Sequence, residues 1–210
     1  MEQVLSKFKN EIWNGEKKGV IGDYCSIKSG YPFKSSWWTD KGMKVIRIGD
    51  ICQDELNLDS CACVNEDNIL KAKEFKVSSG DVVIAMTGAT IGKFSLVSTL
   101  DNVYVNQRVG KFFLGENPLK RVPFIYCTLK MEDVFQEIIN KGQGSAQPNI
   151  SSNDLMSINC VIPNIEIINS FNKYAMPYFK QIISHQIENK KLSLIRDNLL
   201  PKLISGDISL

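Results

Sequence analysis

Short apolar segments separated by turn residues dominate the chain between residues 20 and 114. Residues 43–48 alternate polar and apolar side chains, which is typical of a half-buried strand. Residues 81–86 form a continuous apolar run of strand length between Gly80 and Gly88, which predicts a buried strand. The same patterns predict a turn and a strand within residues 20–27, and further strands at 94–97, 103–105 and 109–114.

Helical spacing replaces the strand pattern beyond residue 120. Apolar residues recur every three or four positions over 121–140, which predicts one helix, and Gly142 and Gly144 are placed to end it. Residues 143–163 are predicted to form a polar link that carries one strand at 155–162.

A long helical segment follows this link. Asn164 can cap its first turn through the side-chain oxygen. Pro177 lacks a backbone donor, so we expect a short helix at 165–176, a bend, and a long helix at 178–200. The residues expected to close the second helix are Pro201 and Gly206.

The stripe along this long helix mixes apolar and polar residues. A seven-residue frame runs through Tyr178, Ile182, His185, Asn189, Leu192, Arg196 and Leu199. An apolar stripe that its own domain does not cover needs a partner helix, and a polar Asn189 in the seam could fix its register. The alternative is a helix folded back on its own domain. We predict an α/β (α+β) domain of mixed short strands over residues 1–163, followed by the helix and tail at 164–210.

Charge is segregated along the chain, although the formal net charge is only +2. Residues 17–47 hold seven basic and two acidic side chains, residues 50–67 hold six acidic and no basic ones, and residues 166–202 hold six basic and three acidic ones. A nearly neutral protein with this distribution can still present a basic face to phosphate groups. Scattered, solvated surface charge explains the pattern equally well.

The composition, 43% hydrophobic and 23% charged over 210 residues, is that of an ordinary globular protein with a sizeable core. The first ten residues mix charges without an apolar run, so we expect no signal peptide; residues 1–15 fit a short polar helix or a loose leader. Without secretion, the six cysteines are expected to be reduced thiols. No apolar run approaches the roughly 20 residues of a membrane span, which predicts a soluble protein.

No catalytic motif is present in full. Residues 88–94 resemble a phosphate-binding loop, but only three residues separate the glycines and Phe94 stands where Ser or Thr is needed. A nucleophile elbow, a dinucleotide fingerprint and the Asn-Pro-Pro-Tyr run of amino-methyltransferases are missing. Cys61-Ala-Cys63 misses the spacing of a zinc knuckle, and His185 is the one histidine, so we expect no metal site. Carboxylates are plentiful and the sequence does not pair them, which leaves a nuclease site open.

Two turn-rich segments carry side chains suited to DNA. Residues 29–38 combine lysine, hydroxyl and aromatic groups, and residues 141–149 carry amides and a lysine on a glycine-bearing backbone. Such amides and lysines can read base edges or hold phosphates. The candidate DNA contacts are Lys28, Lys34, Ser35, Ser36, Lys93, Lys141, Gln143, Ser145 and Gln147. Residue by residue, an ordinary polar loop is the favoured explanation, and Trp37 and Trp38 are more often core residues than stacking platforms.

An ordered set of segments resembles half of a type I restriction-modification specificity (S) subunit, over roughly residues 18–208. The segments lie at residues 21–23, 27–33, 45–51, 80–93, 106–109, 147–150 and 194–208. Three of them read Gly-Asp-Val-Val-Ile-Ala-Met-Thr-Gly-Ala-Thr-Ile-Gly-Lys, Asn-Gln-Arg-Val and Gln-Pro-Asn-Ile. Each segment alone is weak, but their order and spacing together are specific.

This resemblance implies a target-recognition domain that reads three or four base pairs of double-stranded DNA. It implies antiparallel coiled-coil pairing of the long helix with a second such helix, which separates two half-sites. A helix of 23 residues spans about 35 Å, near one turn of DNA. The residues expected along the seam are Tyr178, Ile182, His185, Asn189, Leu192 and Leu199.

The resemblance also implies that catalysis belongs to partner subunits. Methyltransferase (M) subunits with S-adenosylmethionine, and restriction (R) subunits with ATP and magnesium, would dock on the S subunit in the cytoplasm of a bacterium or archaeon. The chain itself is then expected to be non-catalytic and to hold no cofactor. Segments shared with the family, including residues 88–92 and 106–108, are expected to support the fold rather than to read bases.

The chain departs from the family pattern in length, because the usual S subunit has two recognition domains and two spacer helices. Two copies of this chain could pair head to tail as a homodimer, or the chain could pair with another specificity half. A regulatory half-subunit that competes for the methyltransferase without reading DNA is an alternative. A stand-alone nuclease or methyltransferase with unrecognised residues is a third.

Overall fold

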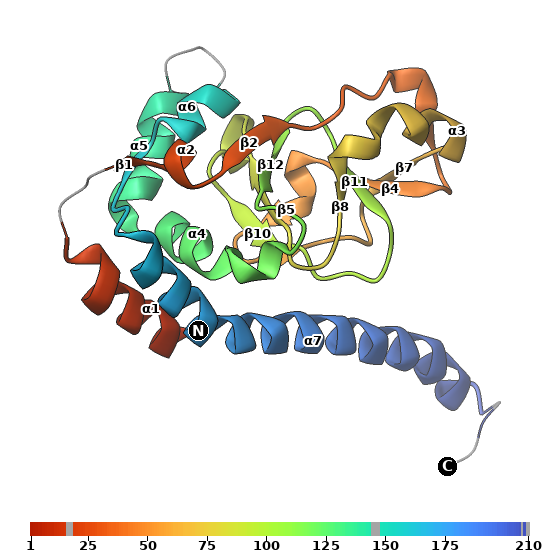
Figure 1. The fold of residues 1–210 in the computed structure, drawn as a ribbon. Coiled ribbons are helices and arrows are strands. Elements are labelled where there is room, and N and C mark those ends of the chain that lie inside the picture. Colours follow the sequence, from red (N-terminus) through yellow and green to blue (C-terminus); the bar gives the residue numbers. More distant parts are fainter. Residues whose placement is uncertain (16–18, 144–147, 207, 209–210) are drawn as a thin grey trace.

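Two β-sheets form the centre of the domain, and one long helix runs beside them and continues past its edge (Figure 1). The structure is a computed structural model and describes residues 1–15, 19–143, 148–206 and 208. Most helices gather beside the four-stranded sheet, and α3 (Glu66–Ile69) lies at the opposite end of the domain, beside the five-stranded sheet (Figure 1). The predicted α/β (α+β) class, with mixed short strands and a long C-terminal helix, is confirmed.

The first sheet is antiparallel throughout, in the order β10-β9-β12-β2. Its strands are β10 (Phe94–Leu96), β9 (Val82–Ala85), β12 (Val109–Phe113) and β2 (Ser26–Ser29). The strands predicted at 81–86, 94–97 and 109–114 are therefore confirmed. Residues 20–27 contain the short helix α2 (Ile21–Tyr24), so the strand expected there begins later than predicted.

The second sheet has the order β3-β7-β4-β11-β8, and only β4 and β11 run parallel in it. Its strands are β3 (Trp38–Thr39), β7 (Ala62–Val64), β4 (Met43–Ile46), β11 (Val103–Val105) and β8 (Lys76–Val77). Two further pairs join β5 (Ile51–Cys52) to β6 (Glu55–Leu56) and β1 (Gly19–Val20) to β13 (Asn159–Cys160).

Strand β9 separates two hydrophobic cores. Val82 and Ile84 face a large core shared with the helices, while Val83 and Ala85 face a smaller core between the two sheets. A strand buried on both faces has no polar face, which is why residues 81–86 read as one apolar run. A third, small core contains Phe33, Val45, Val64, Ile69, Ala72 and Tyr104.

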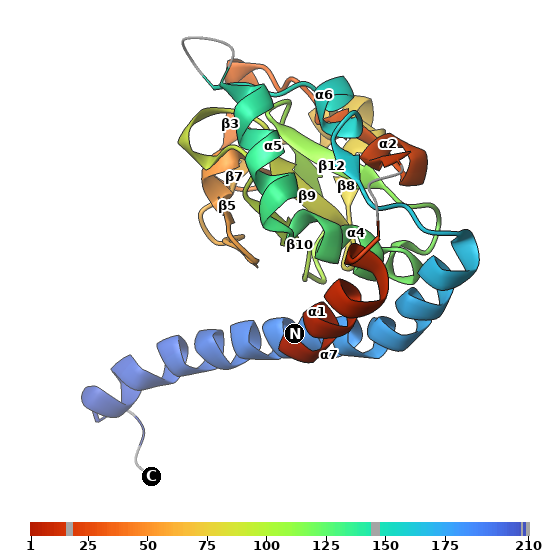
Figure 2. The same cartoon turned by 90° about the vertical axis from the view of Figure 1, so that its left-hand side faces the viewer.

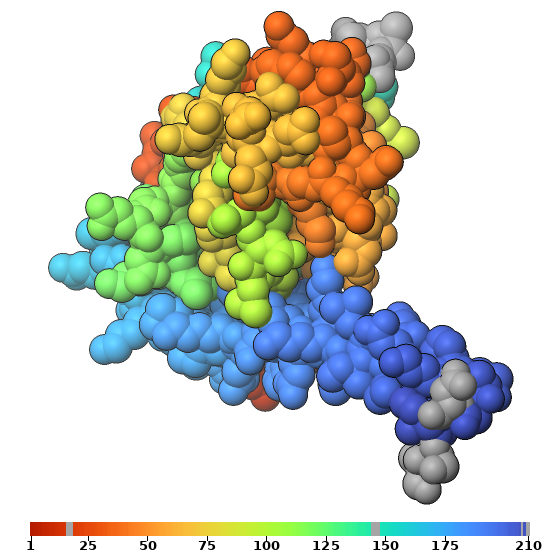
Figure 3. Space-filling model, turned by 90° about the vertical axis from the view of Figure 1, so that its right-hand side faces the viewer, coloured from red at the N-terminus to blue at the C-terminus, as the bar shows by residue number. Residues whose placement is uncertain are grey.

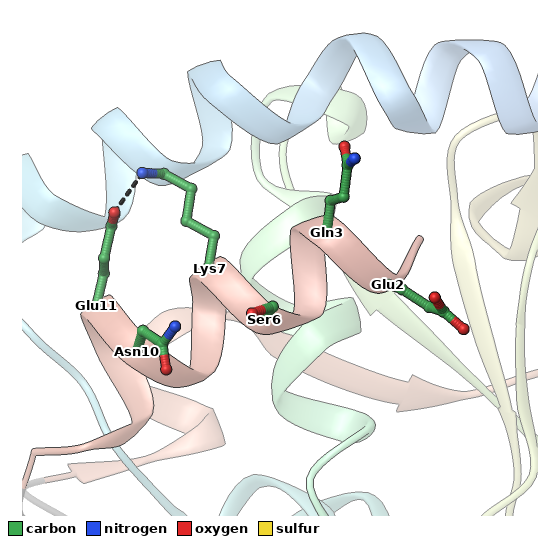
Figure 4. Close-up of a pocket in the computed structure, with 6 residues that line it drawn as sticks. All are labelled: Glu2, Gln3, Ser6, Lys7, Asn10 and Glu11. Carbon is green, nitrogen blue, oxygen red and sulfur yellow. Dashed lines mark hydrogen bonds and ion pairs between the residues drawn. The ribbon is translucent and has the colours of Figure 1, made fainter.

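The N-terminal segment is part of the large core, so the loose-leader alternative is wrong. Helix α1 (Glu2–Phe8) continues as a π-helical stretch (Lys9–Trp13) and buries one face, with Val4 and Phe8 fully covered. The Phe8 ring centroid lies 5.3 Å from that of Phe171 on the long helix. The N-terminal segment also carries an ion pair between Lys7 and Glu11 (Figure 4). This pair lies in a shallow hollow of about 530 Å³ beside the long helix.

The single helix expected over 121–140 is two helices, α4 (Val122–Leu129) and α5 (Glu132–Gly142). The break is at Met131, whose backbone is extended, and acidic residues begin the second helix, where they complement its dipole. Every residue of α4 is buried, whereas α5 buries one stripe. The apolar periodicity continues across the break, which is why the sequence did not reveal it.

The prediction of a strand at residues 155–162 is wrong for most of that range. Residues 152–156 form the short helix α6 (Ser152–Met156), because Ser151 and Asp154 make a reciprocal capping box at its start. Only Asn159 and Cys160 are in a strand, where they pair with β1. Both capping residues lie in the segment for which the sequence predicts a polar link, and the pattern does not indicate their capping role.

Helix α7 (Ile165–Ile204) is continuous for 40 residues and contains both Pro177 and Pro201. The Asn164 side chain accepts a hydrogen bond from the Ile167 N–H at 2.9 Å, which confirms the predicted cap. The expectation of two separate helices is wrong, although Figure 2 shows α7 changing direction along its course. Pro201 does not close the helix; Gly206, with φ +77°, follows its end.

The two halves of α7 differ in burial. Its first half packs into the large core through Ile168, Phe171, Ala175, Phe179 and Ile183. From residue 191 to 204 every residue is exposed, and this part projects beyond the domain (Figure 3). Folding back on the domain therefore describes the first half of the helix, and the division at residues 163 and 164 stays a prediction about folding units.

Candidate nucleic-acid interface

Four turns that are distant in the sequence meet where strands of the four-stranded sheet begin or end. Strand β9 ends there and β12 begins there, as their register of Ala85 opposite Val109 requires. Strand β2 ends beside them, with Ser29 opposite Gly110. We call residues 29–31, 86–90, 106–108 and 148–152 the strand-end cluster. It lies on the side of the domain away from α7 (Figure 1).

Backbone hydrogen bonds fix these turns to one another. The Met86 N–H donates to the Arg108 carbonyl at 3.0 Å, and the Met86 carbonyl accepts from the Ile150 N–H at 2.9 Å. The Gly88 N–H donates to the Pro148 carbonyl at 2.9 Å, and the Tyr31 N–H donates to the Val105 carbonyl at 2.9 Å. The cluster is therefore a rigid platform rather than a set of independent loops.

A groove of about 650 Å³ runs through the strand-end cluster. Its lining residues are Ser29, Met86, Thr87, Gln107, Arg108, Pro148, Asn149, Ile150, Ser151 and Ser152. Gln107 and Arg108 are exposed at its rim, and Thr87 is buried in its wall. The Ser29 and Ser152 hydroxyl oxygens lie 3.2 Å apart.

Three of the predicted DNA contacts lie on elements that continue into this cluster. Lys93 follows the turn at 88–92 and is half-buried, and Lys141 and Gln143 lie at the end of α5. The Gly142 carbonyl accepts from the Asn149 N–H at 2.9 Å, which ties the end of α5 to the cluster. The candidates Ser145 and Gln147 lie outside the described residues.

The other predicted contacts form a second group beside the third, small core, which contains Phe33 and Tyr104. The Lys28 ammonium pairs with Glu74, so its charge is offset. The Lys34 ammonium lies 5.6 Å from the Trp37 ring centroid, and Ser35 and Ser36 are exposed. Trp37 stacks on Tyr31 with ring centroids 6.2 Å apart and, like Trp38, is half-buried against the small core.

The groove contains polar side chains that the sequence does not predict as DNA contacts. Gln107 and Arg108 belong to a segment expected to support the fold, yet both are exposed and line the groove. Thr87 lies within the segment 80–93 that the family shares, and the sequence predicts no separate role for it. The available signal was a turn of three polar residues, Asn106 to Arg108, between two strongly apolar strands.

Features of other functional classes are sparse in the described part of the chain. Among its residues, no three His, Cys, Asp or Glu side chains gather as a metal site would require. No disulfide joins any of the six cysteines, and burial raises the pKa of the Cys25, Cys61 and Cys127 thiols to about 12. None of the helices described has the length and apolarity needed to cross a membrane.

Comparison with known proteins identifies the family. Residues 14–196 match the model of the type I restriction modification DNA specificity domain. The chain belongs to this family. It is 34% identical over 212 residues to the MjaIX specificity subunit of Methanocaldococcus jannaschii. This match covers 94% of the present chain and 45% of that subunit. The chain is 31% identical over 121 residues to the HindI specificity subunit of Haemophilus influenzae, covering 57% and 26%.

Solved structures of specificity subunits share the fold. The S subunit from M. genitalium matches with a TM-score of 0.59 at 16% identity, over 96% of this chain and 52% of that one. The HsdS subunit from Thermoanaerobacter tengcongensis matches with a TM-score of 0.53 at 15% identity, over 99% and 51%. The specificity domain described here therefore spans about half the length of the relatives that it matches.

Proposed function

We propose that this chain is a DNA sequence-specificity subunit of a type I restriction-modification system and that it recognises one half of a bipartite target. One observation carries the proposal: a specificity domain of the family presents a fixed cluster of polar turns on the side opposite a projecting helix. Fixed polar turns can hold DNA in one register, and a projecting helix can hold a second reader at a set distance.

The exposed end of α7 supports pairing with a second helix. Its exposed apolar residues are Leu192, Leu194, Ile195, Leu199, Leu200, Leu203 and Ile204. Of the predicted seam, Tyr178 and Ile182 pack against the domain's own core, whereas His185, Asn189, Leu192 and Leu199 are exposed. The proposed antiparallel coiled coil therefore uses the distal part of the helix, in a homodimer or with another specificity half.

Catalysis is assigned to partner subunits in this proposal. M and R subunits would dock on the chain and supply the S-adenosylmethionine, ATP and magnesium chemistry, and the chain would hold no cofactor. The family match supports this division, because the family is one of DNA specificity rather than of catalysis. The DNA contacts proposed within the described residues are Lys28, Lys34, Ser35, Ser36, Lys93, Lys141 and Gln143.

Mapping of methylated adenines tests the proposal. Cells that lack their own specificity subunit would express a compatible M subunit with and without this chain. The expected result is a new split motif that appears only with the chain. Mirror-related halves would indicate a homodimer, and unlike halves would indicate pairing with another specificity chain. No new motif, with the complex shown to assemble, would contradict the proposal.

One alternative is a regulatory half-subunit that binds the methyltransferase without reading DNA. If purified chain binds the M subunit, fails to bind any duplex, and lowers methylation by an intact S subunit, the regulatory function replaces the proposed one.

A further inference from the structure

Among the residues that the structure describes, none that lines the groove in the strand-end cluster carries a carboxylate. Its lining is made of hydroxyls, side-chain amides, apolar groups and one guanidinium. The hollow between α7 and the β5–β6 hairpin has Glu55, Asp59 and Asp197 in its lining. The hollow beside β8 has Asp81 and Glu116. A concave site with donors and no carboxylate is suited to an anion.

Arg108 supplies the positive charge of this groove. Its guanidinium makes no ion pair or hydrogen bond with any residue that the structure describes, and the side chain is exposed at the rim. Its backbone, however, is fixed, because its carbonyl accepts from the Met86 N–H at 3.0 Å and its N–H approaches the Asn106 Oδ1 at 3.5 Å. A guanidinium on a fixed backbone matches the geometry of a phosphate, which it can hold through two parallel hydrogen bonds.

Thr87 lies in the wall of the groove, but its hydroxyl does not face the open space. The residue is 9% exposed, and its Oγ1 is buried beneath the surface. The donors available to a ligand in the groove are therefore those of the exposed rim and of the serine hydroxyls.

We infer that this groove seats one phosphate group, held by the Arg108 guanidinium at its rim. The inference rests on the proposed function for its source, a backbone phosphate of duplex DNA. The Ser29 and Ser152 hydroxyls line the same groove 3.2 Å apart. One of them donates to the other, which leaves one hydroxyl proton to donate to the phosphate. Since phosphates carry no base identity, this contact fixes the register of the domain on DNA, and base reading belongs to other side chains.

Two variants of Arg108 test the inference by fluorescence anisotropy with a labelled duplex that carries the mapped half-target and with a scrambled duplex. R108Q is expected to weaken binding of both duplexes by the same factor, about tenfold or more. It should also reduce the slope of log K against log salt concentration by about 1, because one phosphate contact is lost. R108K keeps the charge and should restore the slope with only part of the affinity.

The matched control is K120Q, which removes an exposed positive charge beside α7 and should leave both affinities and the slope unchanged. A loss confined to the half-target duplex would overturn the inference, because it would make Arg108 a base reader. Unchanged binding of both duplexes by R108Q would also overturn it. Circular dichroism of each variant checks that the fold is intact.

Inorganic phosphate separates failure of the inference from failure of the proposed function. If the parent chain binds no duplex, the proposed function fails. Titration with inorganic phosphate, followed by NMR of the backbone amides, then tests the groove directly. Shifts confined to residues 86–88 and 107–108 that vanish in R108Q would support a phosphate seat with another source. No shift in that experiment would overturn the inference.

Discussion

The close approach of backbones in the strand-end cluster depends on single residues without side chains. A Cβ on Gly30 would lie 2.2 Å from the Val105 carbonyl oxygen and 2.4 Å from that of Asn106. These are backbone atoms of the turn that presents Gln107 and Arg108, so they cannot move aside as the end of a side chain would. Gly30 therefore sets how near β2 lies to that turn.

G30A is expected to lower the free energy of unfolding by about 2 kcal/mol, since overpacked buried positions typically cost 1–3 kcal/mol. Urea unfolding followed by tryptophan fluorescence measures the change. G49A is the matched control, because nothing lies within 4 Å of a Cβ at Gly49 and its φ is not positive. Equal stability of G30A and G49A would contradict the packing argument.

The β5–β6 hairpin shows how an element can fix the position of a helix through polar contacts. Asp54, at its turn, has φ +65° and is the one non-glycine residue with positive φ in the described part of the chain. Its carboxylate accepts from the Tyr126 hydroxyl and pairs with the Lys130 ammonium, both on or next to α4. Burial raises the pKa of Tyr126, so this hydroxyl stays protonated and can donate.

The same hairpin region touches α7 where the helix leaves the domain. Asp59 pairs with the Lys190 ammonium at 2.9 Å, and the hydrogen bond from that lysine lowers the pKa of the carboxyl group. Ser98, next to the hairpin, donates to the Gln186 side chain. Every residue of α7 from 191 to 204 is exposed, so these contacts of the hairpin region lie at the point where the helix leaves the domain.

D54N tests the hairpin contact. Asparagine tolerates positive φ and can accept from Tyr126, but it leaves the largely buried Lys130 ammonium without its carboxylate. The free energy of unfolding is expected to fall by about 1–3 kcal/mol, the usual result of leaving a buried charged partner unsatisfied. D101N is the control, because Asp101 pairs with Lys44 at 3.4 Å on the surface, where such pairs contribute about 0–1 kcal/mol. A chemical denaturation series that ranks D101N below D54N would contradict this account.

Sequence patterns predicted the elements whose burial is simple and missed those set by local polar groups. Strand β9 was clear because both of its faces are apolar, and the Asn164 cap was clear because its side chain acts three residues away. Helix α6 was missed because a five-residue helix held by one capping box carries no apolar period. The break at Met131 was missed because α4 and α5 lie on one continuous apolar pattern.

The candidate site was harder to predict because it exists only in the fold. Lys141 and Gln143 lie on the end of α5 that hydrogen bonds tie to the strand-end cluster, so the polar segment at 141–149 was informative. Arg108 and Thr87 belong to turns about 20 residues apart in the sequence, and only the pairing of β9 with β12 brings them together. No local pattern shows which polar groups a sheet register will place side by side.

At the scale of the whole molecule, the chain is an anchored domain with a rigid arm. The anchor is the first half of α7, whose Phe171, Phe179 and Ile183 lie in the large core. The arm is residues 191–204, all exposed and helical, which span about 21 Å at 1.5 Å per residue. Because the arm is one helix with its anchor, the position of a partner on it is fixed relative to the strand-end cluster.

Truncation after Lys190 separates the two parts. It keeps Ile183 and Ile187, which pack on the large core, and it removes the exposed apolar residues of the arm. The truncated chain is expected to be a monomer with the melting temperature of the parent within a few degrees. The full chain is expected to associate with rising concentration, since exposed leucine and isoleucine on one helix gain free energy by pairing. Sedimentation equilibrium measures both.

Substitution within the arm distinguishes pairing from general adhesion. L192D together with L199D places charges in the proposed seam and should make the full chain monomeric. The control is K191E together with K202E, which changes charge at exposed basic positions outside the predicted seam. This control should leave a dimer largely intact. A truncated chain that dimerises as the full chain does would contradict the arm as the pairing surface. If the full chain stays monomeric at high micromolar concentration but pairs with a second, different specificity half, the arm works in a heterodimer, and the split target would then have unlike halves.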